Sequence, residues 1–383
     1  MSRFRAAVWL IALFALLTPT LRAAEDNQPH LVLIGISDYA DKQIQDRPNA
    51  ERDVKALYDL FTNNKRLKVK KENVRLLLGS KDEKRKSEPA TRANILKAIR
   101  WLAKNADEDD LAILAFIGQG GPLGERGTRT CYFASDSTLK ERDKTSIAAA
   151  EIGQELDKRK SKKFCVFLDV NFKGFDAGKE SIPEPSLGDN PYKEFLGDDG
   201  SIEHLPLQGR VIFLATNGLT TSPDLKDHGV FTQALLSGLE GKADKEGYEA
   251  DGLITVPELR KHVNEEIPEL KRKHNKIVTD VRKRTDHFVI AGRSARFTLT
   301  ENPEARAKSL ARLEKFKKLT LDKSIAEEGE RFLSRMPKLK AHRKLRQEYQ
   351  KLADGGSYRE FARNRDAINA TTRLPLSVAT KYA

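Results

Sequence analysis

Two apolar stretches decide the fold: LAILAFIGQGG (residues 111–121) and FCVFLDVNFKG (residues 164–174). Each begins with a short, nearly continuous run of apolar residues and then changes to glycine and polar residues. Such runs are typical of strands that are buried on both faces of a parallel sheet. Parallel strands need long crossover connections, which are usually helical. These stretches therefore predict an α/β fold.

The flanking sequence continues the alternation of strands and helices. Similar apolar runs occur at residues 31–36, 74–78 and 210–216. Helices are indicated between them by apolar residues three and four positions apart and by a capping threonine. We therefore predict a mainly parallel sheet covered by helices on both faces. The residues that indicate the helices are Val54, Leu57, Tyr58 and Phe61, then Ile95, Ile99 and Leu102 after the cap Thr91, and the stretches 231–239 and 257–263.

The N-terminus has the pattern of a secretory signal peptide. Arg3 and Arg5 precede an apolar run at residues 6–17, and small residues follow before a polar segment. The run is shorter than the roughly 20 apolar residues that a membrane-spanning helix needs. We predict a signal peptide at residues 1–23 and a secreted or periplasmic mature protein without a transmembrane segment. A retained membrane anchor is the alternative.

The C-terminal part is a basic region with helical periodicity. Residues 301–383 carry 20 lysines and arginines against 11 acidic residues, so they hold most of the net charge of +13. Residues 28–300 form the main domain, and residues 301–383 are predicted to be a basic helical extension. An anionic partner could bind this extension, but mixed charges and few aromatics argue against nucleic acid. A solvated helical face that packs on the main domain is the other interpretation.

The ends of the two deciding strands carry a family resemblance. In open α/β sheets, ligands bind beyond the carboxyl ends of the strands. There the chain resembles the caspase and metacaspase family, whose members read Ser-Gly-His-Gly after one strand and Asp-x-Cys-x-Ser-Gly after the next. The catalytic His and Cys are about 50 residues apart, and Gln119 and Asn171 are separated by 52 residues. Residues 33–39, 132–136 and 228–239 resemble further family segments in the same order. The resemblance covers residues 30–265 and implies a caspase-like three-layer sandwich.

The departures from the family pattern fall on its catalytic residues. Gln119 stands in place of the His and Asn171 in place of the Cys, while Ile117 and Lys173 replace the two serines. An amide neither titrates near neutral pH nor acts as a useful nucleophile. The pattern therefore favours an inactive pseudopeptidase that binds a peptide or protein in the relic cleft. The alternatives are an active cysteine-type endopeptidase with an atypical site and a scaffold whose basic tail binds an anionic partner.

No other residue offers a local replacement. Cys165 lies six residues before Asn171, about 20 Å along an extended strand, and His228 and His204 have no visible nucleophile partner. Cys131 and Cys165 lie in apolar runs. We interpret them as buried free thiols rather than as a disulfide.

The resemblance also implies a binding site. Asp169, two residues before the Cys position, and Asp53, in the first helix, match metacaspase-like positions that hold a basic side chain. Gly118 and Gly120, which flank Gln119, belong to the same candidate site. The alternative is that Asp169 only caps loop amides.

We expect neither a cofactor nor a metal. Residues 247–258 echo a calcium loop, but glycine replaces its first acidic ligand. A turn into a capped helix explains the segment better.

Overall fold

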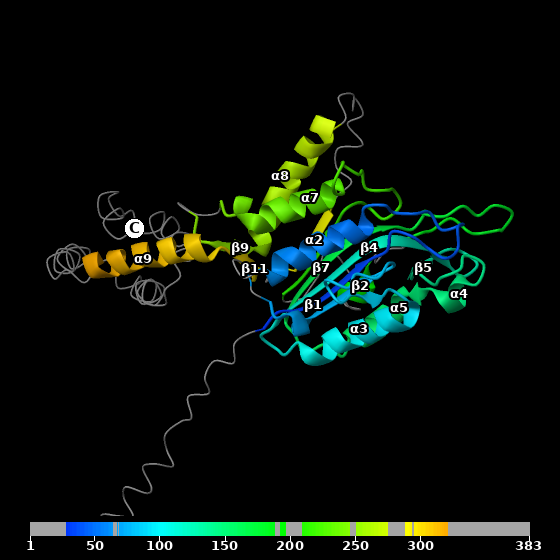
Figure 1. Cartoon of the computed structure of the whole chain (residues 1–383), viewed down its shortest axis with the longest axis horizontal. Coiled ribbons are helices and arrows are strands. Elements are labelled where there is room, and N and C mark those ends of the chain that lie inside the picture. Colours follow the sequence, from blue (N-terminus) through cyan, green and yellow to red (C-terminus); the bar gives the residue numbers. More distant parts are fainter. Residues whose placement is uncertain are drawn as a thin grey trace, which may run out of the picture.

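The computed structural model describes residues 28–63, 67, 69–187, 192–196, 209–245, 250–274, 288–292 and 295–320 (Figure 1). The predicted signal peptide, His204 and residues 321–383 lie outside the described residues.

The core of the molecule is a mainly parallel sheet. Its strands follow the order β10-β8-β7-β4-β1-β2-β3, and every neighbouring pair is parallel except β10 with β8. The predicted fold class is confirmed, since each apolar run of the sequence forms one of the central strands. The strands are β1 (His30–Gly35), β2 (Val74–Leu78), β3 (Glu88–Pro89), β4 (Leu111–Leu123), β7 (Lys163–Asn171), β8 (Arg210–Leu214) and β10 (Phe288–Ala291).

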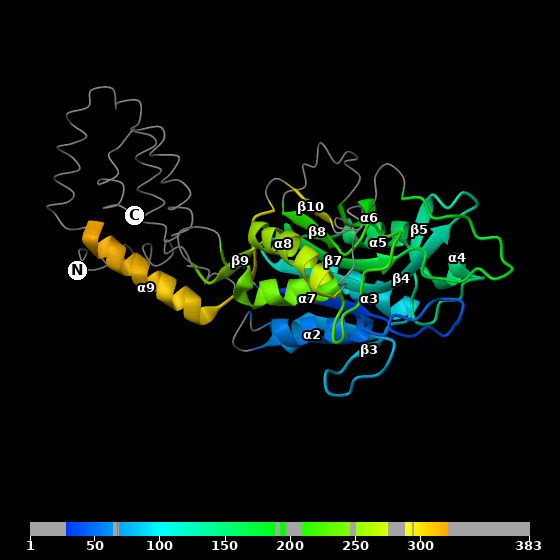
Figure 2. The same cartoon turned by 90° about the horizontal axis from the view of Figure 1, so that it is seen from above.

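Helices cover both faces of this sheet, which gives three layers (Figures 1 and 2). One face packs against α2 (Ala50–Thr62), α7 (Val230–Ser237) and α8 (Val256–His274). The other packs against α3 (Arg92–Asn105) and α5 (Ala149–Leu156).

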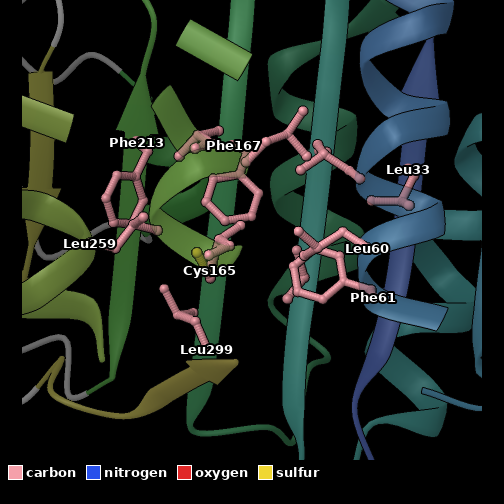
Figure 3. Packing of buried hydrophobic residues seen from close by; sticks show 14 of the residues in the cluster. Leu33, Leu60, Phe61, Cys165, Phe167, Phe213, Leu259 and Leu299 are labelled. Atoms are coloured by element: carbon pink, nitrogen blue, oxygen red, sulfur yellow. The ribbon is translucent and has the colours of Figure 1, made fainter. Parts of the chain in front are cut away.

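Successive residues of each strand enter opposite layers because side chains alternate across a sheet. Leu33 of β1 therefore packs under α2 beside Phe61, while Ile34 belongs to the core on the other face. Figure 3 shows the first of these cores, where Cys165 and Phe167 of β7 lie between α2 and the helices that follow β8.

Shorter elements extend the edges of the sandwich. A 3-10 turn (Lys71–Asn73) precedes β2, and a π-helical turn (Gly238–Lys242) follows α7. The remaining elements are β5 (Arg129–Tyr132), α4 (Arg142–Thr145), β6 (Ile147–Ala148), α6 (Lys193–Leu196), β9 (Leu253–Thr255), β11 (Thr298–Glu301) and α9 (Pro303–Thr320). The first part of the predicted helical extension is thus the helix α9, which points away from the sheet (Figure 1). Among the described residues, no helix has the length and apolar content needed to cross a membrane.

Strand β4 is longer than the sequence predicts. The apolar run ends at Ile117, but the strand continues to Leu123. Gly118 and Gln119 still pair with β7, and the residues from Gly120 onward pair antiparallel with β5. The strand therefore continues beyond its apolar run, because backbone pairing with β7 and then with β5 keeps residues 118–123 extended.

The segment that resembles a calcium loop leads into a capped helix, α8. The Glu258 carboxylate accepts hydrogen bonds from the backbone N–H and the hydroxyl of Thr255, directly before α8. This is half of a capping box, which stabilises a helix N-terminus. No group of three or more His, Cys, Asp or Glu side chains in the described part of the chain could hold a metal ion.

Both cysteines are buried and free, as predicted. Burial raises the pKa of the Cys131 thiol to about 12, and it raises the pKa of the Cys165 thiol as well. We therefore expect neither thiol to react with a disulfide reagent at about pH 8 in the folded protein, because the thiolate is the reactive form. Both should react once urea unfolds the chain. Rapid labelling of one thiol without denaturant would contradict this arrangement.

A buried histidine joins α7 to α8. His262 forms a 2.7 Å hydrogen bond through Nε2 with Oγ of Ser237. Burial lowers the pKa of His262, an effect that the nearby acid Glu266 opposes and Lys245 and Lys242 reinforce. The folded state therefore binds the proton less readily than the unfolded chain.

The pH dependence of stability follows from this shift. Above the ordinary histidine pKa of 6.5, the neutral ring adds its full contribution, and as the pH falls below 6.5 the free energy of unfolding should decrease. His262→Gln can keep a hydrogen bond to Ser237 but cannot titrate. We expect urea unfolding at a series of pH values to show a smaller acid-side loss for this variant. An identical acid-side slope in both proteins would contradict the prediction.

Candidate functional site

The two positions that resemble the catalytic pair lie side by side. Gln119 of β4 and Asn171 of β7 are register partners on adjacent parallel strands. Neighbouring strands are about 4.8 Å apart, and register partners point to the same face of the sheet. The structure therefore brings Gln119 and Asn171 together, although 52 residues separate them in the chain.

The Gln119 side chain is held inside the protein. Only 1% of its surface is exposed, and its Nε2 donates a 3.0 Å hydrogen bond to the carbonyl of Gln45. Its backbone N–H donates to the Tyr39 hydroxyl oxygen at 2.7 Å. The amide also lies against Gly174, where no Cβ would fit. Gln119 thus acts as a packing residue with a fixed orientation.

Asn171 is equally constrained. It is 4% exposed, and its Oδ1 accepts a hydrogen bond from the backbone N–H of Lys173 at 3.0 Å. Its Nδ2 donates to Oγ1 of Thr221, also at 3.0 Å. The side chain organises the turn after β7, and it offers neither a nucleophile nor a proton acceptor to a substrate.

A short segment of the loop between β1 and α2 lies against Gln119. We call residues 43–47 the strap. The strap lies antiparallel to residues 174–176, with hydrogen bonds from Gln45 N–H to the Gly174 carbonyl at 3.0 Å and from Asp176 N–H to the Gln43 carbonyl at 2.7 Å. The strap therefore holds the Gln119 side chain from one side and is itself fixed to the turn after β7.

The last residue of the strap, Arg47, reaches Asp169. Its Nη2 lies 3.0 Å from Oδ1 of Asp169, and its Nη1 donates to the Gly118 carbonyl at 3.2 Å. Both side chains are buried, with 4% and 2% exposed surface. Burial alone would lower the pKa of Arg47, but the charge of Asp169 offsets this and the pKa is raised. Asp169 is thus not an open carboxylate, and its side chain pairs with an arginine instead of capping loop amides.

Asp53 also has partners from its own chain. Its Oδ1 lies 2.7 Å from Nδ1 of His228, and its Oδ2 accepts a hydrogen bond from Gly229 N–H at 3.1 Å. Burial raises the pKa of Asp53, and the hydrogen bond from His228 partly opposes the shift. His228, which has no evident role in the sequence, fixes this carboxylate at the start of α2.

Three carboxylates gather around Gly229. A Cβ placed on this glycine would lie 3.1 Å from Oδ2 of Asp53, 3.6 Å from Oδ1 of Asp224 and 3.9 Å from Oδ2 of Asp169. Oδ2 of Asp169 is buried and has no hydrogen-bond partner among the described residues. The structure therefore brings Asp53 and Asp169 together with Asp224. The sequence analysis missed Asp224 because a lone loop aspartate carries no signal.

The two candidate glycines, Gly118 and Gly120, lie in close contact with neighbouring protein groups. A Cβ at Gly118 would lie 2.8 Å from the Tyr39 hydroxyl, and one at Gly120 would meet the Cys131 carbonyl and the Phe172 ring. Glycine is needed at both positions because other groups approach the backbone closely.

The chain is similar to solved structures and to one family model. A protein of Geobacter sulfurreducens with a crystal structure is 14% identical, with a TM-score of 0.41, over 72% of this chain and 93% of that one. A pro-caspase-1 structure is 12% identical, with a TM-score of 0.39, over 69% of this chain and 91% of that one. No curated protein sequence matches the chain. The family model of the caspase domain (Peptidase C14) matches residues 29–289, more than half of the chain, and the chain therefore belongs to the caspase-domain family.

Proposed function

We propose that this protein is a non-catalytic member of the caspase-domain family that acts by binding. The observation that carries the proposal is the state of the paired positions: Gln119 and Asn171 are both buried amides, and both are hydrogen-bonded to the loops around them. Cleavage by this family's mechanism needs a thiolate and a titrating imidazole. Neither group is present at these positions.

The alternative of an active cysteine peptidase has little support. Cys165 faces the core under α2 and Cys131 lies in the opposite core, so neither thiol is accessible. The alternative of a scaffold with an anion-binding tail depends on residues 301–383, of which 321–383 are outside the described part of the chain. It stays a separate prediction.

The ligand that we propose for the relic cleft is a basic segment of a peptide or protein. Three carboxylates surround Gly229, whereas Arg47 supplies the one permanent positive charge among their contacts described above. The local charge is therefore negative at neutral pH. Asp224 is only partly buried and can meet an incoming lysine or arginine through a charge-assisted hydrogen bond. The signal peptide pattern supports an encounter outside the cytoplasm.

Binding without cleavage is the test. A fluorescent octapeptide of alternating arginine and alanine should bind in an anisotropy titration, and mass spectrometry should recover it intact. Asp224→Asn should weaken binding about fivefold, which corresponds to about 1 kcal/mol. Asp143→Asn removes an exposed carboxylate from α4 and serves as the matched control. Equal weakening by both variants, or peptide cleavage, would contradict the proposal.

A further inference from the structure

A second candidate site lies away from the paired strand ends. A groove of about 630 Å³ opens between α8 and residues 291–292 and 295–296, which follow the start of β10 and precede β11. Figure 2 shows α8 beside β10. One wall is formed by Val256, Pro257, Arg260, Lys261, Asn264 and Glu265, and the other by Ala291, Gly292, Ala295 and Arg296.

The groove is at the opposite end of the sheet from the relic cleft. Ala291 pairs with Val211, and Gly292 N–H donates to the carbonyl of Arg210, the first residue of β8. Asp169 lies near the last residue of the parallel strand β7. The two sites can therefore be tested independently, and the groove does not depend on the proposed function of the cleft.

Three cations line the groove from both walls. Arg260 and Lys261 project from α8 and Arg296 from the facing segment, and all three are exposed. None forms an ion pair or a hydrogen bond with another side chain of the described residues. Glu265 is the single acid among the described residues of the lining. The surrounding sequence, residues 256–296, is basic too, with eleven lysines and arginines against six acidic residues.

The rest of the lining restricts the kind of anion that fits. Its small apolar residues, Ala291, Gly292 and Ala295, leave room for a backbone with short side chains. The lining residues that the structure describes include no aromatic residue on which nucleic acid bases could stack. Glu265 would repel the evenly spaced phosphates of a nucleic acid, whereas a peptide can place a neutral residue there.

We propose that this groove binds an acidic peptide segment of a partner protein. Carboxylates of the segment meet Arg260, Lys261 and Arg296 through charge-assisted hydrogen bonds. The small residues Ala291, Gly292 and Ala295 contact the residues between these carboxylates. A volume of this size suits a short stretch of peptide, since small-ligand sites are typically about 300–1,000 Å³.

Anisotropy with the full chain tests the proposal. The probe is a fluorescent octapeptide of alternating glutamate and alanine, and the comparison peptide has glutamine in place of each glutamate. The acidic probe should bind, and the Arg260→Gln, Lys261→Gln double variant should lower its affinity about tenfold. Glu265→Gln should increase the affinity about threefold because it removes a like charge. That gain separates direct contact from a structural role.

Matched controls make the outcome decisive. Lys97→Gln with Lys104→Gln removes two exposed cations from α3, on the other face of the sheet, and should leave the affinity unchanged. All of these positions are exposed, so thermal unfolding should confirm that every variant is folded. An equal loss in the α3 variant would show unspecific attraction to a basic protein and overturn the proposal. A single-stranded DNA of equal charge that binds tighter than the peptide would overturn it in favour of nucleic acid.

Discussion

Replacing Arg47 by methionine is expected to lower the free energy of unfolding by about 3–5 kcal/mol, because it leaves Asp169 as a buried carboxylate without its counter-ion. The Gly118 carbonyl would lose its hydrogen bond from the same guanidinium. Methionine fills a similar volume, so the loss of the charge and its hydrogen bonds should dominate over any loss of packing. Urea unfolding at neutral pH measures the effect.

A double-variant cycle separates the ion pair from general damage to the loop. Asp169→Asn alone leaves a buried guanidinium without its partner and should also be destabilising. The combined Arg47→Met, Asp169→Asn protein should be more stable than the sum of the single losses indicates. Arg52→Met is the matched control, since Arg52 is exposed. Among the described residues, its guanidinium donates hydrogen bonds only to the carbonyl oxygens of Lys226 and Asp227. A loss below about 1 kcal/mol for Arg47→Met would contradict the importance that we assign to the buried pair.

The second large effect concerns catalysis. The wild-type protein should not cleave fluorogenic peptides with basic or acidic cleavage-site residues above the buffer rate. The variant Gln119→His, Asn171→Cys restores the family's residue types at adjacent register positions. We expect this variant to be inactive as well, because both positions are buried and a substrate cannot reach a thiol at a position that is only 4% exposed.

The assay has three outcomes: the wild type is active, only the double variant is active, or neither is active. Activity of the wild type would overturn the non-catalytic proposal. Activity of the double variant alone would support the loss of the dyad but show that the two buried positions become accessible in solution. Alkylation of the new thiol by a small electrophile provides a readout besides turnover, and it should be slow in the folded protein and fast in urea. The single variant Asn171→Cys controls for the effect of the imidazole on that thiol.

The sequence by itself determined the layered sheet and the identity of the paired positions. The apolar runs that became β1, β4, β7 and β8 are long enough and continuous enough to require burial on both faces, so their order along the chain already implied a parallel sheet. Gln119 and Asn171 follow two of these runs, and adjacent strand ends meet in space. That inference needed only local patterns.

The tertiary structure decided which charged side chains from distant segments meet at the ends of the strands. Nothing in the sequence around Arg47 indicates that its guanidinium lies on Asp169, because the path of the loop between β1 and α2 depends on contacts with residues 174–176, far away in the chain. Asp224 joins Asp53 and Asp169 around Gly229 for the same reason. The spacing of apolar residues along the chain indicates which residues are buried. The pairing of charged side chains across loops depends on how distant segments meet in the folded protein, and no local sequence pattern indicates it.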